Sequence, residues 1–496
     1  MNKKFNVPIS VLLVLTLTAC IFVSCADKNS AGSGGGSESV NKAGQDAETN
    51  ETGETETVRL YPDVPEKNYD GYSFIILNID PSTMHWATHT LVAEQQNGDV
   101  LNDSIYNRNM EVEEKLGIKV ENTIVAHSAI ASKIQSAVAA DLHEFDAAML
   151  GIEGQGNLGH GGYLANWKDV PYVNLEKPWW SKATNDEISI KNRLFFAAGD
   201  ISIAYYDAVM PLAMNITMAN NYNLETPYEL VLSSKWTADK EAEMMKAVTE
   251  DLDGDGVMTV SDRFGMFGMS EEYSALLIAF NEKYIIKDND DVPYLAINAE
   301  SFQRAFEKAI QTMNNDDVFL NYRLPRFDKT GSGLSLVHIF PNGQALFTSD
   351  VLFHLSKYRS MEDDIAILPR PKYDEAQEKY YSYIHPSAVL MCIPSTNPDI
   401  ERTGIILETL AAYSKYTVIE TYYNIVLSQK YARDESSIKM LDIIFGDRVA
   451  DLGSIFNWGS VRSSVEKQGT ESNTDIASLY AKIGTQVKTA IEKIIE

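Results

Sequence analysis

Tyr72-Ser73-Phe74-Ile75-Ile76-Leu77 begins the part of the chain that decides the fold. This short apolar run is typical of a buried strand. Ile118–Thr123 alternates apolar and polar residues as a strand does, and Ala147–Leu150 is again a short apolar run. Between them, Leu101–Leu116 and Ile130–Ala140 carry apolar residues at helical spacing. Strands that alternate with helices predict an α/β fold with a mostly parallel sheet. Ligands of such sheets bind at loops that leave the carboxyl ends of the strands.

A second α/β unit is expected to begin after about Pro211. Before it, Glu187–Phe196 has two extended runs around Lys191-Asn192, which predicts a hairpin. From Asp399 onward the chain is expected to be nearly all helical. The other expected strands are Val209–Asn215, Ala345–Thr348, Ile365–Leu368 and Val389–Ile393, and the other expected helices are Thr237–Thr249, Tyr273–Phe280, Ser301–Met313 and Leu334–Phe340.

Length and charge limit what the protein does. A chain of 496 residues is too long for one hydrophobic core and suggests roughly two to four folding units. Its 70 acidic residues outnumber its 42 basic ones, which gives a net charge of −28. Phosphate backbones are repelled by such a surface, so nucleic acid is excluded as a partner.

The N-terminus carries the pattern of an export signal. Met1–Lys4 is a short basic segment, and the apolar run Val7–Cys25 follows it. Both Leu17–Cys20 and Phe22–Cys25 resemble the lipobox of bacterial lipoproteins, in which the cysteine becomes the lipid-carrying N-terminus. Residues 1–25 are therefore interpreted as a lipoprotein signal peptide, and the rest of the chain is expected outside the cytoplasm, tethered to the outer face of the membrane.

Two points of that interpretation stay open. Leu17, three places before Cys20, fits a lipobox better than Phe22, three places before Cys25. Cys25, however, is followed at once by polar residues, and we favour Cys25 for the lipid. A plain transmembrane anchor is the alternative, because about 20 apolar residues span a bilayer. Residues 26–57 are rich in Gly, Ser, Thr and Glu and predict a flexible acidic tether. Beyond the signal only Cys392 remains, so an intramolecular disulfide is excluded.

The segment Asp251–Asp262 matches the calcium loop of EF-hands. Asp251, Asp253 and Asp255 occupy positions 1, 3 and 5, and a glycine follows at position 6. Position 12 holds Asp262 in place of Glu, whose longer side chain reaches a cation better. We expect a weak, structural Ca²⁺ site with Asp251, Asp253, Asp255, Val257 and Asp262 as ligands, and an acidic turn that binds nothing is the alternative.

Aromatic side chains near turn signals point to the kind of ligand. Trp86, Trp458 and the run Tyr205-Tyr206-Asp207 lie outside the apolar runs. Sugar rings stack their flat apolar faces on aromatic rings, while carboxylates and amides bind the hydroxyls. Any single Trp is more often a packing residue than a ligand contact. As a set these residues favour a neutral polar ligand.

Further short motifs resemble the extracellular solute-binding proteins of bacterial ABC importers, of the carbohydrate-type family 1 lipoproteins. The resemblance runs from about Tyr69 to Trp458. Beside the calcium-like loop, the matching segments are Ile105–Asn109, Val112–Lys115, Phe145–Ala147, Lys177–Trp180, Gly199-Asp200, Pro227–Val231, Lys235–Thr237, Arg263–Gly265, Ile367–Lys372 and Arg433–Ser437.

This resemblance implies a two-lobed periplasmic-binding-protein-like fold of class II, with hinge strands and a helical C-terminal tail. The chain would cross between the lobes near Met210–Asn215, Ile367–Pro369 and Ser414–Ile419. One lobe would comprise residues 58–211 and 370–413, and the other residues 212–369 and 414–496. The implied cleft contacts are Trp86, Glu153, Tyr205, Asp207, Asp350, Phe353, Tyr383 and Trp458.

The function expected from the resemblance is binding without catalysis. A monomeric protein, held by its lipid, would capture a carbohydrate or a similar polar solute between the lobes and deliver it to ABC permease subunits. Val351-Leu352-Phe353 lacks the Trp that sugar binders often have there, which argues against a large stacked oligosaccharide. A secreted glycoside hydrolase and a sensory surface protein are the alternatives.

Overall fold

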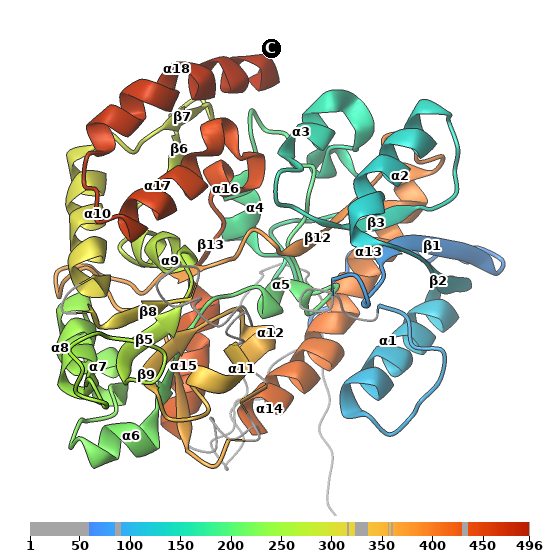
Figure 1. Cartoon of the computed structure of the whole chain (residues 1–496). Helices are drawn as coiled ribbons and strands as arrows, with labels where there is room; N and C mark the ends of the chain where they lie inside the picture. The colour runs from blue at the N-terminus through green and yellow to red at the C-terminus, as the bar shows by residue number, and fades with distance from the viewer. Residues whose placement is uncertain are drawn as a thin grey trace, which may run out of the picture. The chain divides into compact units, whose positions relative to one another are not determined.

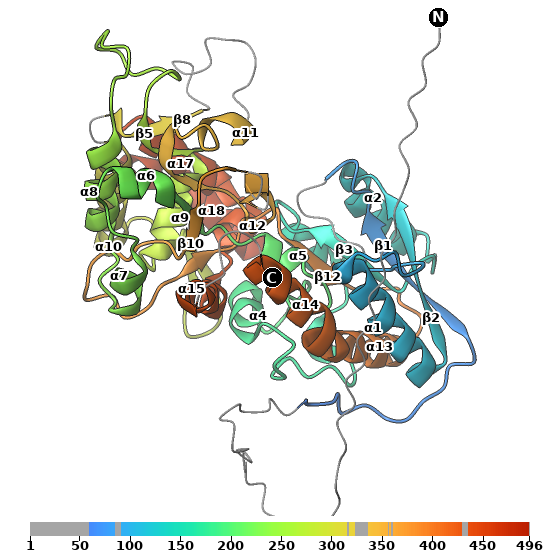
Figure 2. The same cartoon turned by 90° about the horizontal axis from the view of Figure 1, so that it is seen from below.

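The computed structural model describes residues 59–84, 91–314, 317–322, 336–355, 357–358, 361–428 and 435–495. The predicted signal peptide, the tether and both candidate lipid cysteines lie outside these residues. In the part of the chain that the structure describes, no helix combines the length and the apolar character needed to cross a membrane. The described strands form two main sheets and two short ribbons (Figures 1 and 2).

The first sheet confirms the predicted alternation of strands and helices. Its four strands lie in the order β12-β3-β1-β2, with β1 parallel to β2 and β3 and with β12 antiparallel to β3. The strands are β1 (Tyr72–Ile79), β2 (Ile118–Val125), β3 (Ala147–Gly151) and β12 (Val389–Cys392). The antiparallel strand at one edge is therefore supplied by a segment almost 240 residues further along the chain than β3.

The second sheet repeats this arrangement. Its five strands lie in the order β10-β4-β9-β5-β8, with β5 parallel to β8 and β9 and with β4 antiparallel to β9. The strands are β4 (Leu212–Asn215), β5 (Phe264–Gly268), β8 (Phe319–Asn321), β9 (Ala345–Ser349) and β10 (Ile365–Leu368). In both sheets the parallel strand that comes first in the chain lies between the other two parallel strands. An antiparallel strand from elsewhere in the chain pairs with the parallel strand that comes last.

Helices cover both sheets (Figure 1). Helices α1, α2 and α13 pack on or beside the first sheet, and α6, α8, α10 and α15 pack on or around the second. The helices are α1 (Val100–Leu116), α2 (His127–Ala139), α3 (Gly156–Leu158), α4 (Lys182–Ile188), α5 (Ala204–Asp207), α6 (Ile216–Asn221), α7 (Tyr228–Leu232), α8 (Ala238–Val248), α9 (Glu271–Ala279), α10 (Glu300–Met313), α11 (Leu336–Ile339), α12 (Leu352–Leu355), α13 (Ile400–Ser414), α14 (Glu420–Ser428), α15 (Glu435–Gly446), α16 (Leu452–Phe456), α17 (Val461–Thr470) and α18 (Ile476–Ile495).

Local sequence explains the well-predicted helices. Asp99 caps α1 by accepting the amide hydrogen of Asn102 at 2.9 Å, and Gly117 ends the helix with φ 61°. Helix α18 buries residues three or four positions apart, so one face packs on the protein and the other meets solvent. Its buried residues are Ile476, Leu479, Ile483, Val487, Ile491 and Ile494.

Several local features differ from the prediction, and two of them have a clear physical reason. The Glu187–Phe196 hairpin is confirmed only at its Lys191-Asn192 turn, where Ile190 is bridged to Arg193, because α4 continues to Ile188 and replaces the first extended run. Strand β5 was not predicted, because its two glycines are typical of a loop. Gly265 is needed in the strand: a Cβ there would lie 2.3 Å from the Cβ of Met245 on α8.

Most buried apolar residues form one continuous core, but a smaller cluster stands apart from it. The buried members of this crossing cluster are Met210, Ala275, Ile278, Val351, Tyr383 and Val449. Phe353 and Tyr381 are partly buried and pack against the crossing cluster. These residues lie near the segments that connect the two sheets, and two of them, Tyr383 and Phe353, are predicted site residues.

Candidate binding site

Two chain segments run side by side between the sheets. The amide of Met210 donates to the carbonyl of Tyr383 at 3.0 Å, and the amide of His385 donates to the carbonyl of Ala208 at 2.9 Å. Immediately afterwards β4 pairs with β10, which places Leu212 opposite Leu368. The predicted outward crossing near Met210–Asn215 and return near Ile367–Pro369 are therefore neighbours in space.

Helix α5 brings Asp207 to the start of this crossing. Asp207 is buried, and its Oδ1 accepts the hydroxyl hydrogen of Tyr422 on α14. Tyr205, on the same turn, has its hydroxyl within 2.8 Å of Ser181 Oγ and 2.6 Å of Thr184 Oγ1. The guanidinium of Arg448 lies over its ring at 4.2 Å. In this structure Tyr205 therefore packs α5 in place.

Asp350 and Phe353 reach the crossing from the loop after β9. Asp350 is buried, and its Oδ1 accepts the amide hydrogen of Val351 at 2.7 Å, while its Oδ2 lies 2.9 Å from Nδ1 of His354. The amide of Leu352 donates to the carbonyl of Val209 at 2.8 Å, which holds this loop against the outward crossing. Phe353 is half-buried beside the crossing cluster, of which Tyr383 is a fully buried member.

Glu153 lies in the loop after β3 and makes an ion pair with Arg462 of α17. Arg462 also lies 3.8 Å from Glu466, and its side chain is only 15% exposed. Burial lowers the pKa of Arg462, but its electrostatic interactions with Tyr383, Glu466 and Glu153 outweigh this effect and raise the pKa overall. Arg462 thus connects the loop after β3 with the surroundings of Tyr383.

Trp458 follows the end of α16, where Asn457 adopts φ 52°. Its ring stacks on Phe456 with centroids 4.4 Å apart and an interplanar angle of 22°, and the side chain is almost fully buried. The glycine-rich loop that follows β3, residues 154–162, packs against the same pair, because a Cβ at Gly156 would lie 2.3 Å from Cδ1 of Phe456. Glycine at this position therefore lets the loop after β3 approach Phe456 and Trp458 closely.

A groove of about 830 Å³ opens beside Trp458, between the glycine-rich loop and α18. We call it the α18 groove. Its lining is mostly polar on both sides: Asn157, His160 and Gly161 from the loop, and Lys482, Thr485, Gln486, Thr489, Ala490, Lys493 and Ile494 from α18. Burial lowers the pKa of His160 to about 4, so its ring is neutral at physiological pH.

The structure gathers the predicted contacts in two neighbouring groups. Asp207, Asp350, Phe353 and Tyr383 surround the crossing, whereas Glu153 and Trp458 lie at the loop after β3. Trp86 lies outside the described residues. Sequence reasoning did not find Arg462, His354, Tyr422 or the polar face of α18. The only sequence signal for these residues was the i, i+4 spacing of Arg462 and Glu466, which predicts an ion pair. Many surface helices carry such pairs, so this spacing does not indicate a binding site.

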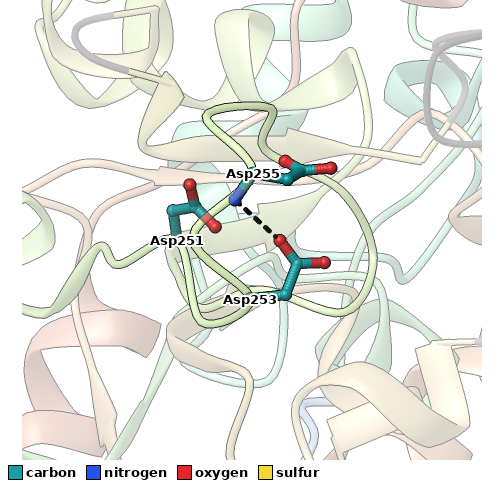
Figure 3. A group of neighbouring side chains, drawn as sticks. All are labelled: Asp251, Asp253 and Asp255. Carbon is teal, nitrogen blue, oxygen red and sulfur yellow. Dashed lines mark hydrogen bonds between the residues drawn. The ribbon is translucent and has the colours of Figure 1, made fainter.

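The calcium-like loop places its first three acidic residues together (Figure 3). One carboxylate oxygen from each of Asp251, Asp253 and Asp255 lies within 4.8 Å of the others. The amides of Gly256 and Gly254 donate to Asp251 and lower its pKa, which favours the charged form. Hard cations prefer such oxygen clusters, so these three residues fit Ca²⁺.

Asp262 is placed differently from these three residues, whereas Val257, which in such loops binds through its backbone carbonyl, stays a prediction. Asp262 is fully buried and accepts the amide hydrogens of Leu252 at 2.9 Å and Thr259 at 2.6 Å, so it ties the two ends of the loop together. Val257 is 55% exposed. The group of carboxylates close enough to share one ion therefore contains Asp251, Asp253 and Asp255 but not Asp262.

Comparison with known proteins identifies the fold. No protein-family model matches the chain, and no curated protein matches it either. Among solved structures, the sugar-binding protein MalE from Xanthomonas citri matches with a TM-score of 0.56 at 13% identity, over 84% of this chain and 98% of that one. A cyclo/maltodextrin-binding protein complexed with maltotetraose matches with a TM-score of 0.54 at 12% identity, over 85% and 96%.

A third match is the ABC substrate-binding protein Lmo0181 from Listeria monocytogenes in complex with cycloalternan. Its TM-score is 0.50 at 12% identity, over 86% of this chain and 98% of that one. At such identities these matches concern the fold. The α/β fold with two sheets is thus that of the two-lobed periplasmic-binding-protein-like proteins, as the sequence predicted.

Proposed function

We propose that this chain is a binding protein that captures a carbohydrate or similar polar solute between two lobes and passes it, unaltered, to an ABC permease. The observation that carries the proposal is the repeated strand order of the two sheets, joined by paired crossing segments. Loops that follow the parallel strands β3 and β9 carry Glu153, Asp350 and Phe353 toward the region of the crossings. Such a crossing lets two bodies close on a ligand by small backbone changes.

The choice of a sugar-like solute has separate support. Two of the solved structures that match in fold are complexes with sugars, maltotetraose and cycloalternan. In this chain, carboxylates and aromatic rings lie together at the candidate site, as polyhydroxylated ligands require. Asp207, Asp350 and Glu153 would accept hydroxyl hydrogens, and Phe353 or Trp458 would stack on a ring. Contacts made only when the lobes are closed would shift the population toward the closed state.

The location of the protein is part of the proposal. Export and attachment of lipid to Cys25, or to Cys20, would hold a monomer at the outer face of the membrane beside its permease. Metabolic labelling with a fatty acid tests the anchor, because the label should be lost when the modified cysteine is replaced by serine. Retention of the label in the variant that lacks both cysteines would refute it.

A thermal-shift screen of the full chain against mono- and oligosaccharides tests the proposed function. A solute at 100 times its Kd should raise the free energy of unfolding by about 2.7 kcal/mol, because it binds the folded state alone. A clear shift with one glycan class and none with peptides is the expected result. No shift with any member of a broad glycan panel would contradict the proposal.

The same samples separate the alternatives. A glycoside hydrolase needs two carboxyl groups about 5–9.5 Å apart across the scissile bond, and it would release shortened glycans into the sample. A sensory surface protein would bind the solute without change, but deletion of the neighbouring permease would leave its biological role intact. Unaltered glycan together with loss of uptake in a strain that lacks the protein favours transport.

We also propose that Asp251, Asp253 and Asp255 bind Ca²⁺ as a structural ion, with affinity in the millimolar to submillimolar range of extracellular sites. Calorimetric titration with calcium should give heat that Asp253→Asn abolishes, because the variant removes one of three clustered carboxylate charges. Asp290→Asn, an exposed aspartate in a different turn, is the matched control and should titrate like the wild type. Absence of heat at millimolar calcium would refute the site.

A further inference from the structure

The α18 groove is lined by positively charged side chains, although the whole chain is strongly acidic. The chain carries a net charge of −28, yet no Asp or Glu is found among the described residues that line this groove. Lys482 and Lys493 both line it, and neither makes an ion pair within the described part of the chain. Lys488, on the same helix, lies 3.9 Å from Glu492 and lines a different groove.

The spacing along α18 places these groups on one face. Lys482, Gln486, Thr489 and Lys493 are three or four residues apart, so they lie along one side of the helix, next to the buried stripe. The carbonyl of Ile494 at the end of the helix already accepts a hydrogen bond from Arg193 Nη2 at 2.9 Å. This contact offsets the partial negative charge that a helix C-terminus would otherwise present to the groove.

The opposite wall adds polar groups without adding negative charge. Asn157 contributes an amide, His160 a neutral ring, and Gly161 leaves backbone accessible, while Trp458 lies at one side as an aromatic surface. At about 830 Å³, the groove is within the size range of small-molecule sites. Ammonium groups, amides and hydroxyls around an aromatic ring suit a sugar that carries an anionic substituent.

We infer that the α18 groove is a subsite for the carboxylate or sulfate group of an acidic glycan. The inference rests on the proposed function and narrows its substrate class, because the sequence alone favours a neutral ligand. Lys482 and Lys493 would supply the positive charge, and Thr485, Thr489 and Gln486 would donate hydrogen bonds.

Matched ligands and matched lysines test the inference. Trigalacturonate and its neutral methyl ester differ in charge but hardly in shape, and a sulfated chondroitin oligosaccharide tests the second source of negative charge. Calorimetry on the full chain should give at least tenfold tighter binding of an acidic glycan than of the neutral ester. Lys482→Gln together with Lys493→Gln should weaken acidic-glycan binding by about tenfold and leave the neutral ester within about twofold, because only the acidic ligand interacts with the two charges.

Lys488→Gln is the control, since it removes one equal charge from the same helix outside the groove. Circular dichroism and thermal unfolding of all variants should match the wild type, because the three lysines lie on the polar face of α18. Neutral glycans that bind as well as acidic ones, or a double variant that behaves like Lys488→Gln, would overturn this inference and leave the proposed function in place. If no glycan binds at all, the proposed function fails, and this inference fails with it.

Discussion

Replacement of Arg370 by Met is expected to destabilise the protein by about 3–5 kcal/mol, the usual result of removing one partner from a buried ion pair. Arg370 follows β10 and is almost completely buried. Its Nη2 lies 2.7 Å from Oε2 of Glu272 on α9, and its Nε donates to the carbonyl of Met210 at 3.4 Å. The variant leaves the carboxylate of Glu272 in the core without a counter-charge.

Chemical denaturation followed by Trp fluorescence measures this effect. Arg370→Met combined with Glu272→Met is the control, because it removes both charges and should recover most of the lost stability. Arg304→Met, which breaks an exposed pair with Glu300, should change the free energy of unfolding far less. A loss below about 1 kcal/mol for Arg370→Met would contradict the assignment of Arg370 as the charge that neutralises this part of the core.

Glu241→Gln is expected to stabilise the protein at pH 8 by up to about 3 kcal/mol and to change little near pH 4.5. Glu241 of α8 is fully buried, and burial raises its pKa from 4.5 to about 7. The charge of Arg370 opposes this rise, and the carboxylate of Glu272 adds to it. These are the charged groups that act on Glu241 within the described part of the chain.

The sign of the pH dependence follows from the direction of that shift. Between pH 4.5 and 7 the folded protein keeps a proton on Glu241 that the unfolded chain has lost, so the free energy of unfolding falls as pH rises. Above pH 7 the folded state must hold an additional buried negative charge beside Glu272. Glutamine resembles the protonated carboxyl and does not titrate, so this contribution to the pH dependence disappears in the variant.

Denaturation curves from pH 4.5 to 8.5 check the prediction. Glu243→Gln, on the same helix but exposed and paired with Lys240, should leave the pH profile unchanged. Parallel profiles of Glu241→Gln and wild type over the whole range would show that Glu241 ionises in the folded protein as it does in the unfolded chain.

The first sheet was predictable because β1 and β3 are short apolar runs, β2 alternates apolar and polar residues, and helical patterns separate the three. Tyr72–Leu77, Ile118–Thr123 and Ala147–Leu150 all fall inside observed strands, and the Val389–Ile393 prediction matches β12 to within one residue. Tertiary packing overrides local signals elsewhere. Glycine residues such as Gly265 usually indicate a loop. Here a glycine is needed in a buried strand, because α8 packs so closely on Gly265 that a side chain would not fit.

The candidate site could be predicted only as a set of loops. Fold topology brings the loops after β3 and β9 near the crossing segments, so Glu153, Asp350 and Phe353 could be predicted there, and their contact with a ligand stays a prediction. Which side chains pair is a different matter: Arg462 is 309 residues from Glu153, and no local pattern connects the two. Asp207 likewise meets Tyr422 across 215 residues. Such contacts depend on how the sheets and the C-terminal helices pack.

Equilibrium dialysis against a mixed glycan pool, followed by mass spectrometry of the retained material, decides whether the chain holds its solute unchanged. We expect one glycan class to be retained at about one molecule per protein, with its mass equal to that of the input, because a closing binding protein forms no covalent bond with its ligand. Shortened or otherwise altered glycans, or a protein that retains none, would contradict this function.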